Sequence, residues 1–140
     1  MLAQAAPCHD VMQHFAEFVG DHNMVAHYAS FDQRFLDAEL DRISRCYTGE
    51  FSCSLLAARR IYQGAPNHQL STLVNYVNIP AEGDFHRALY DSEMTGKVWM
   101  AMLSTLKCKY GLCDISFSLI QKLNKIPKKS VARYLSRVGG

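Results

Sequence analysis

Two stretches of sequence decide how the fold of this chain is interpreted: Val25-Ala26-His27-Tyr28-Ala29-Ser30-Phe31-Asp32 and His86-Arg87-Ala88-Leu89-Tyr90-Asp91. Each places one carboxylate on a structured element, and the second adds a histidine five residues before its aspartate. Acidic ligands for two metal ions beside an imidazole base suit phosphodiester hydrolysis. Such a site needs further carboxylates, and the segment before Asp32 does not supply them at a usable spacing.

Length and composition predict one globular domain. The chain has 140 residues, of which 49% are hydrophobic and 20% charged, and its apolar runs are too short for a transmembrane helix. The N-terminus lacks the basic and apolar regions of a signal peptide. Five cysteines without a CxxC pair favour reduced thiols. We therefore expect a cytoplasmic protein without a membrane partner.

Charge is distributed unevenly along the chain. The first 104 residues carry seven basic and twelve acidic side chains, a net charge of −5, and the remainder carry eight basic and one acidic, a net charge of +7. A basic region beside acidic metal ligands suits a phosphate-bearing partner. The same pattern also fits an ordinary solvated helical tail.

The apolar spacing predicts a helix-rich α/β fold. Helices are expected near residues 9–19, 30–43, 69–77, 88–106, 114–123 and 127–139, and short strands at 24–28 and from residue 51, where a helix follows to residue 62. Ser30 and Gln33 read as a capping box, and Asp114 as the cap of a later helix. The helix from Ser30 is expected to bury a set of apolar side chains: Phe31, Phe35, Leu36, Leu40 and Ile43.

Taken one at a time, the candidate site residues also fit ordinary roles. Asp32 and Asp91 each fall in the first turn of a predicted helix, where a carboxylate complements the helix dipole. His86 is equally compatible with a surface loop. The other histidines form no zinc-ligand pattern, and the sequence contains no GxSxG, Walker A or GxGxxG motif, which argues against serine hydrolases and nucleotide-cofactor enzymes.

In order and spacing, the two stretches resemble the second and third motifs of the DEDDh 3′–5′ exonucleases, the family of RNase T and of the proofreading epsilon subunit of DNA polymerase III. His27 to Asp32 resembles the family's His-Asn-x-x-Phe-Asp, with Tyr28 in place of asparagine, and His86 with Asp91 matches His-x4-Asp. The segment Asn67-His68-Gln69-Leu70 resembles the lead into the helix before the third motif. The likeness covers about residues 1–106.

The resemblance implies a site and a reaction. Asp32 and Asp91 would be metal ligands for two divalent cations, Mg²⁺ or Mn²⁺, and His86 the general base that deprotonates the attacking water. Tyr28, Ser30 and Phe31 would shape the approach of the terminal nucleotide. The substrate would be the 3′ end of single-stranded DNA or RNA, and the products nucleoside 5′-monophosphates, as in DNA proofreading or repair.

The resemblance also implies an incomplete ribonuclease H-like exonuclease fold that lacks its first strands and carries a C-terminal helical extension. The family's first motif, Asp-x-Glu on the first strand, has no counterpart, so we expect an N-terminally truncated chain with weakened metal binding and little or no activity alone. The expected parts are a partial exonuclease domain, residues 1–106, and a basic helical tail, residues 107–140, that contacts nucleic acid through five side chains: Lys107, Lys109, Lys128, Lys129 and Arg133.

Two further interpretations stay open. The chain could be a non-catalytic module that binds nucleic acid or a DNA polymerase through the basic tail. Alternatively, a second copy could replace the missing strands, since an incomplete sheet leaves an edge that favours pairing.

Overall fold

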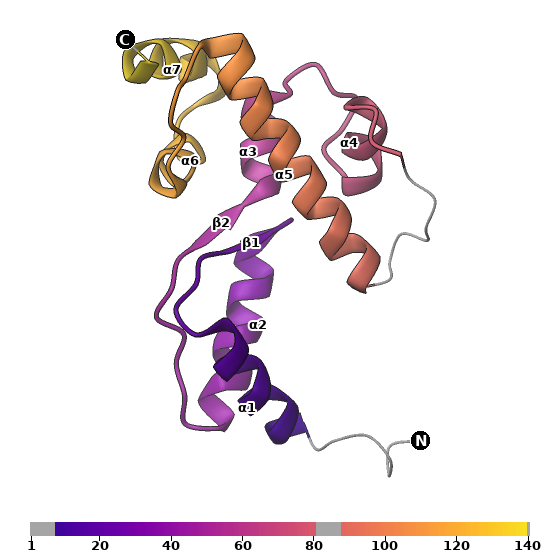
Figure 1. Cartoon of the computed structure of the whole chain (residues 1–140), viewed down its shortest axis with the longest axis vertical. Coiled ribbons are helices and arrows are strands. Elements are labelled where there is room, and N and C mark those ends of the chain that lie inside the picture. The colour runs from indigo at the N-terminus through magenta and orange to yellow at the C-terminus, as the bar shows by residue number, and fades with distance from the viewer. Residues whose placement is uncertain (1–7, 81–87, 140) are drawn as a thin grey trace. The chain divides into compact units, whose positions relative to one another are not determined.

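The computed structural model describes residues 8–80 and 88–139. Its elements follow one another along the chain as shown in Figure 1: α1 (Cys8–Val19), β1 (Met24–Ala26), α2 (Ala29–Arg42), β2 (Phe51–Cys53), α3 (Ser54–Ile61), α4 (Leu70–Tyr76), α5 (Ala88–Tyr110), α6 (Phe117–Leu123), the 3₁₀ helix η2 (Lys128–Ser130) and α7 (Val131–Gly139). The helix-rich α/β character predicted from the spacing is confirmed. No described helix is both long and apolar enough to cross a membrane.

The chain forms two compact units. The first unit comprises Met1–Met24 and Ser30–Phe51, and the second comprises Val25–Ala29 and Ser52–Gly140. The strands β1 and β2 pair as a small parallel sheet, and α2 supplies the crossover connection that a parallel pair requires.

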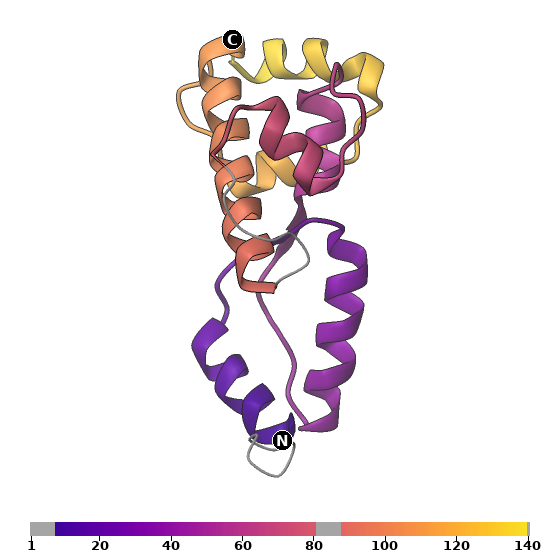
Figure 2. The same cartoon turned by 90° about the vertical axis from the view of Figure 1, so that its right-hand side faces the viewer.

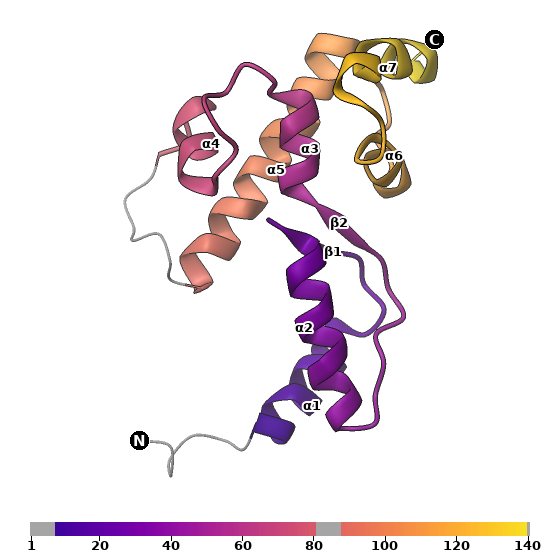
Figure 3. The same cartoon turned by 180° about the vertical axis from the view of Figure 1, so that it is seen from behind.

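The core of the second unit is built around α5. Met94, Val98, Met102 and Leu106 recur every four residues along this helix and are at most 2% exposed, so they form one buried stripe. Figures 1 and 3 show α3 beside α5, with α4 and α6 on opposite sides of this pair. The other core side chains come from all of these helices and from α7: Ala57, Ala58, Ile61, Tyr62, Leu73, Val74, Leu112, Leu119, Ile120, Leu123, Val131 and Leu135.

One predicted helix start in the second unit is wrong by a few residues. Asp114 does not cap α6. Ser116 is the cap, because its hydroxyl oxygen accepts a hydrogen bond from the backbone N–H of Leu119 at 3.1 Å. A serine three residues before that amide has the geometry typical of an N-cap.

The first unit consists of α1 and α2 side by side (Figure 2) and the loop after α2. Leu36 and Leu40 are buried, and they line a pocket of about 220 Å³ together with Phe15 and Val19 of α1. The expectation that α2 also buries Phe31 and Phe35 is wrong, because these side chains are 59% and 61% exposed. They form a second apolar stripe, which the described part of the first unit leaves uncovered.

The start of α2 also differs from the capping-box prediction. The helix begins at Ala29, so Ser30 lies within its first turn and not at the N-cap. Tyr28 precedes the helix with φ of 78°, and this left-handed conformation ends the extended segment that starts with β1.

Candidate functional site

Asp32 lies in the first turn of α2, in the first unit. Neighbouring protein atoms partly remove its carboxylate from water and raise its pKa above the usual value, while a hydrogen bond with its own backbone lowers it. A bound cation would favour the charged form and oppose this shift. Ser30 and Phe31 precede Asp32 in the same turn and are both exposed.

Asp91 lies in the first turn of α5, in the second unit, and its side chain is half-buried. Its backbone carbonyl accepts a hydrogen bond from the Thr95 hydroxyl at 2.8 Å. The structure describes Asp32 and Asp91 each within its own unit, so their roles as shared metal ligands stay a prediction. His86 lies outside the described residues.

His27, which opens the second motif, is the centre of a hydrogen-bonded cluster in the second unit. Its Nε2 is 2.7 Å from the carbonyl oxygen of His68, and its Nδ1 is 2.7 Å from the hydroxyl oxygen of Ser54. A carbonyl oxygen only accepts, so Nε2 donates; in the neutral ring Nδ1 then accepts from the Ser54 hydroxyl. Burial lowers the pKa of His27 and favours this neutral form.

The cluster continues through His68, whose Nε2 lies 2.8 Å from the carbonyl oxygen of Tyr62. Ser54 is fully buried, so the Ser54–His27 pair has the residue types of a nucleophile and its base but no access for a substrate. We therefore assign it a structural role, joining the end of β1 to the start of α3 and to the loop before α4. Sequence reasoning missed this cluster, although His27 and His68 both lie in the segments that carry the family resemblance.

Next to this cluster the second unit has an open pocket of about 400 Å³. Its lining includes Tyr28, His27, Arg59, Asn67 and His68, and no carboxylate is among the described residues that line it. Arg59 gives the pocket a positive charge. Tyr28 is 55% exposed and stands where the family motif has asparagine.

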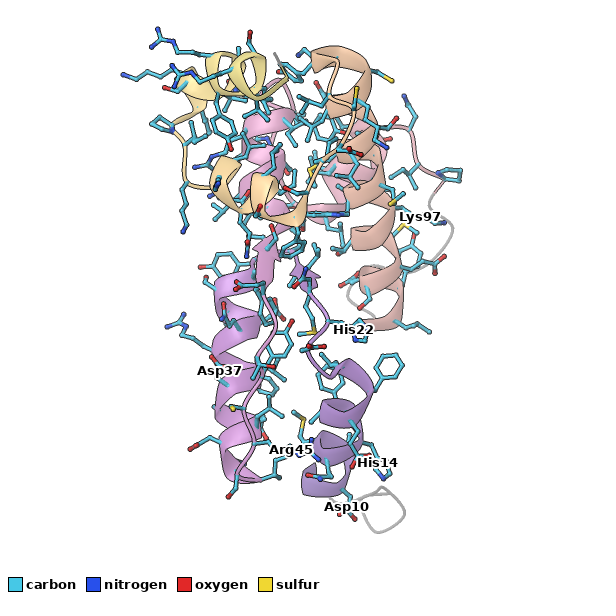
Figure 4. The ribbon with its side chains drawn as sticks, turned by 60° about the vertical axis from the view of Figure 1, so that its left-hand side comes forward. Asp10, His14, His22, Asp37, Arg45 and Lys97 are labelled. Carbon is cyan, nitrogen blue, oxygen red and sulfur yellow. The ribbon has the colours of Figure 1, made fainter. Side chains whose placement is uncertain are left out.

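The acidic residues of the described chain that could correspond to the family's Asp-x-Glu motif do not lie on a strand. Asp10 lies on α1 (Figure 4), and Glu17 on the same helix pairs with Arg45 at 3.7 Å. The tripeptides Asp-x-Glu at 37–39 and 91–93 are both inside helices, whereas β1 and β2 have no acidic residue. Within residues 8–80 and 88–139, no group of three or more potential metal ligands comes together.

The predicted nucleic-acid contacts all lie in the second unit and are exposed. Lys107 and Lys109 are in the last turn of α5, Lys128 and Lys129 form most of η2, and Arg133 is on α7. The segment after residue 106 also contributes Leu119, Leu123 and other side chains to the core of the second unit. It is therefore packed on the rest of that unit, and the predicted boundary at residue 106 stays untested.

Comparison with known proteins gives the family. The family model RNase_T, described as "Exonuclease", matches residues 1–99. The chain is 35% identical over 104 residues to a DNA polymerase III PolC-type protein of Bacillus cereus, which covers 74% of this chain and 7% of that protein. It is 29% identical over 119 residues to the DNA polymerase III subunit epsilon of Aquifex aeolicus, which covers 81% of this chain and 56% of that protein.

The chain thus spans about half the length of the epsilon subunit and a small part of the PolC-type protein. No solved structure matches it. The family model covers well over half of the 140 residues, including both motifs with His27, Asp32, His86 and Asp91. The chain therefore belongs to the RNase T exonuclease family.

Proposed function

We propose that this chain carries part of a metal-dependent 3′–5′ exonuclease site. Asp32 and Asp91 are the proposed metal ligands, and His86 is the proposed general base. The observation that carries the proposal is the family match, which spans all three residues in the expected order. Carboxylate oxygens are the donors that Mg²⁺ and Mn²⁺ prefer, so the donor types suit these metals.

The proposed reaction is hydrolysis of the last phosphodiester bond. The His86 imidazole takes a proton from the attacking water, and the water oxygen bonds to phosphorus as the bond to the 3′ oxygen of the preceding nucleotide breaks. The released 3′ oxygen takes up a proton from solvent, which leaves the strand one nucleotide shorter with a 3′ hydroxyl. The product is a nucleoside 5′-monophosphate. Two divalent cations, when bound, would neutralise the charge that develops on the phosphate oxygens. Tyr28, Ser30 and Phe31, all exposed, are proposed to contact the terminal nucleotide.

We expect the activity of the 140-residue chain to be weak. The described strands carry no acidic residue, and the described residues bring together no group of three potential ligands. With only two proposed carboxylates, metal affinity should be low.

The test is the release of mononucleotide from 3′-labelled single-stranded DNA and RNA in Mn²⁺ or Mg²⁺. Slow metal-dependent release should be lost in His86→Ala and in Asp91→Asn. Glu93→Gln is the matched control for Asp91→Asn, because Glu93 lies two residues away on α5 and pairs with Lys97 at 3.5 Å. It should retain activity. Metal-dependent release that is unchanged in both site variants would contradict the assignment of these residues, and robust release from the wild-type chain would contradict the expected weak activity.

A second proposed function is that of a non-catalytic module that associates with nucleic acid or with a DNA polymerase. It is supported by the excess of basic residues in the second unit. The relatives named DNA polymerase III are consistent with a place in a polymerase assembly. Co-purification of the chain with a replicative polymerase at moderate salt, independent of added DNA, would distinguish polymerase association from nucleic-acid binding.

A further inference from the structure

The two units have opposite net charges. The first unit has three basic and eight acidic residues, and the second has twelve basic and five acidic. These counts give net charges of −5 and +7. The charge asymmetry seen along the sequence therefore follows the division of the fold. A compact unit with such an excess of positive charge attracts polyanions.

The basic residues of α7 lie on the face opposite to its core contacts. Val131 and Leu135 are buried at 1% and 0% exposure, whereas Arg133 and Arg137 are exposed. Lys129, in η2, lies four residues before Arg133. Arg133 and Arg137 are four residues apart on α7, so they fall on one helix face about 6 Å apart along the axis, and Lys129 lies in the 3₁₀ turn that leads directly into this helix. We call Lys129, Arg133 and Arg137 the α7 cationic stripe.

The other exposed side chains of α7 that the structure describes are Ala132, Ser136 and Val138, and none of them is acidic. In Figure 4, long side chains that end in nitrogen project outward from the yellow ribbon of α7. The planar guanidinium groups of Arg133 and Arg137 suit phosphate, because their N–H donors match its oxygens in pairs.

The turn that leads into the stripe is hydrogen-bonded to α3 and to the loop that follows it. Arg60 Nε donates to the carbonyl oxygen of Ile126 at 2.7 Å, and Gln63 Nε2 donates to that of Lys128 at 3.2 Å. These bonds hold η2 in place before any ligand arrives. Binding then has less ordering entropy to overcome than binding by a disordered basic tail.

No ion pair within residues 8–80 and 88–139 neutralises the stripe. Among the described residues, none of its three cations forms an ion pair with a carboxylate, and the one acidic residue after Ser104 in the sequence is Asp114. Lys97 offers a contrast, since it lies on α5 (Figure 4) with its Nζ 3.5 Å from Glu93.

Resting on the second proposed function, association with nucleic acid, we infer that the α7 cationic stripe is the surface that binds the phosphate backbone of a strand, without reading its sequence. The strand would lie along η2 and α7, and each of the three cations would neutralise one phosphate. Lys128, which flanks the stripe, would add to the local field. This binding surface is separate from the proposed carboxylates and needs neither metal nor hydrolysis.

The test is a salt titration of binding to 5′-labelled oligo(dT), measured by fluorescence anisotropy in EDTA. The stripe variant is Lys129→Gln/Arg133→Gln/Arg137→Gln. The matched variant is Lys97→Gln/Lys122→Gln/Lys125→Gln, which removes the same charge from exposed positions outside η2 and α7 that are not among the predicted nucleic-acid contacts. Glutamine keeps the helix propensity of lysine and arginine, and circular dichroism checks that both variants fold.

For the stripe variant we expect the slope of log K against log salt to fall in magnitude by about 2, since each phosphate contact on a single strand contributes about 0.7. The matched variant should change the slope by less than half of that. Oligo(dT) and oligo(dA) should bind with similar affinity. Because EDTA prevents hydrolysis, failure of this test does not bear on the exonuclease proposal.

Three results would overturn the inference. One is an equal decrease of the salt slope in both variants, which would mean that the oligonucleotide is attracted to the positive charge of the whole second unit and not to the stripe. Another is binding to vesicles that contain anionic lipid without measurable binding to oligonucleotide. The third is a stripe-dependent dimer in size-exclusion chromatography at low salt that oligonucleotide does not dissociate, which would assign the stripe to the acidic first unit of a second copy.

Discussion

The first and second units are both built mainly from helices, yet they bury their apolar residues very differently. In the second unit α5 has neighbours on several sides, and Leu73, Val98 and Leu106 are fully buried. In the first unit α2 carries two apolar stripes, of which one, with Leu36, packs next to α1 and the other, with Phe35, is exposed. The number of neighbouring elements, more than the apolar pattern of a helix, decides how much of that pattern is buried.

This difference bears on the proposed site because its carboxylates belong to different units. Asp91 lies on the long helix at the centre of a well-packed core, whereas Asp32 lies on a helix with one described packing partner. The sole tryptophan, Trp99, is on α5, with its ring 6.1 Å from that of Phe117. Its fluorescence therefore reports on the second unit, whereas far-ultraviolet circular dichroism reports on both.

The largest expected effect is on the free energy of unfolding after truncation in the core of the second unit. Leu106→Ala should lower this free energy by about 2–5 kcal/mol, because it removes buried methyl groups and leaves a cavity. Phe35→Ala, in the first unit, should change it by less than about 1 kcal/mol, because the ring is largely exposed. Urea unfolding followed by Trp99 fluorescence and circular dichroism measures both. Equal losses in the two variants would remove the contrast between the units.

A smaller effect is expected from the hydrogen bonds of His27. Ser54→Ala removes the hydroxyl that donates to Nδ1 and leaves a buried acceptor unpaired, at a cost of about 1–3 kcal/mol. Ser71→Ala is the control, since Ser71 is an exposed residue of α4. The same urea titration compares them. A Ser54→Ala chain as stable as the control would show that the cluster does not hold β1 to α3.

The lowered pKa of His27 also predicts a pH dependence of stability. Burial disfavours the charged ring in the folded state, so below the ordinary value of 6.5 the unfolded chain binds more protons than the folded chain. The free energy of unfolding should therefore fall as the pH drops from about 6.5 towards the pKa of His27 in the folded protein. Urea titrations at several pH values between 5 and 8 measure this, and His27→Gln should flatten the dependence. If the free energy of unfolding of His27→Gln depended on pH as steeply as that of the wild-type chain, His27 would not be the group responsible.

The smallest expected effect is a gain in stability at the strained position before α2. Tyr28 has φ of 78°, a conformation that costs an ordinary side chain about 1–2 kcal/mol and that asparagine tolerates better. Tyr28→Asn should raise the thermal midpoint by a few degrees, and Tyr28→Phe, which keeps the strain, should leave it unchanged. A lower thermal midpoint in Tyr28→Asn would mean that the Tyr28 phenol makes a stabilising contact that outweighs the cost of the left-handed backbone conformation.

The sequence predicted the positions of the helices and strands better than it predicted which side chains are buried between them. The spacing of apolar residues was enough to predict α1, α4, α5 and the two short strands, because the period of a helix or strand is visible within a few neighbouring residues. The exposure of Phe31 and Phe35 depends on which elements pack against α2, and local spacing holds no information about that. The His27 cluster was likewise out of reach, since it joins residues 27 and 41 positions apart.

Amide hydrogen exchange, resolved by helix, tests the contrast between the units most directly. In native conditions the amides of α1 and α2 should exchange through openings of clearly lower free energy than those of α3 and α5, whose slowest amides should approach the free energy of global unfolding. The difference should shrink when Leu106→Ala weakens the second unit. Equal protection of α2 and α5 in the wild-type chain would contradict the account, because it would mean that both units open as one.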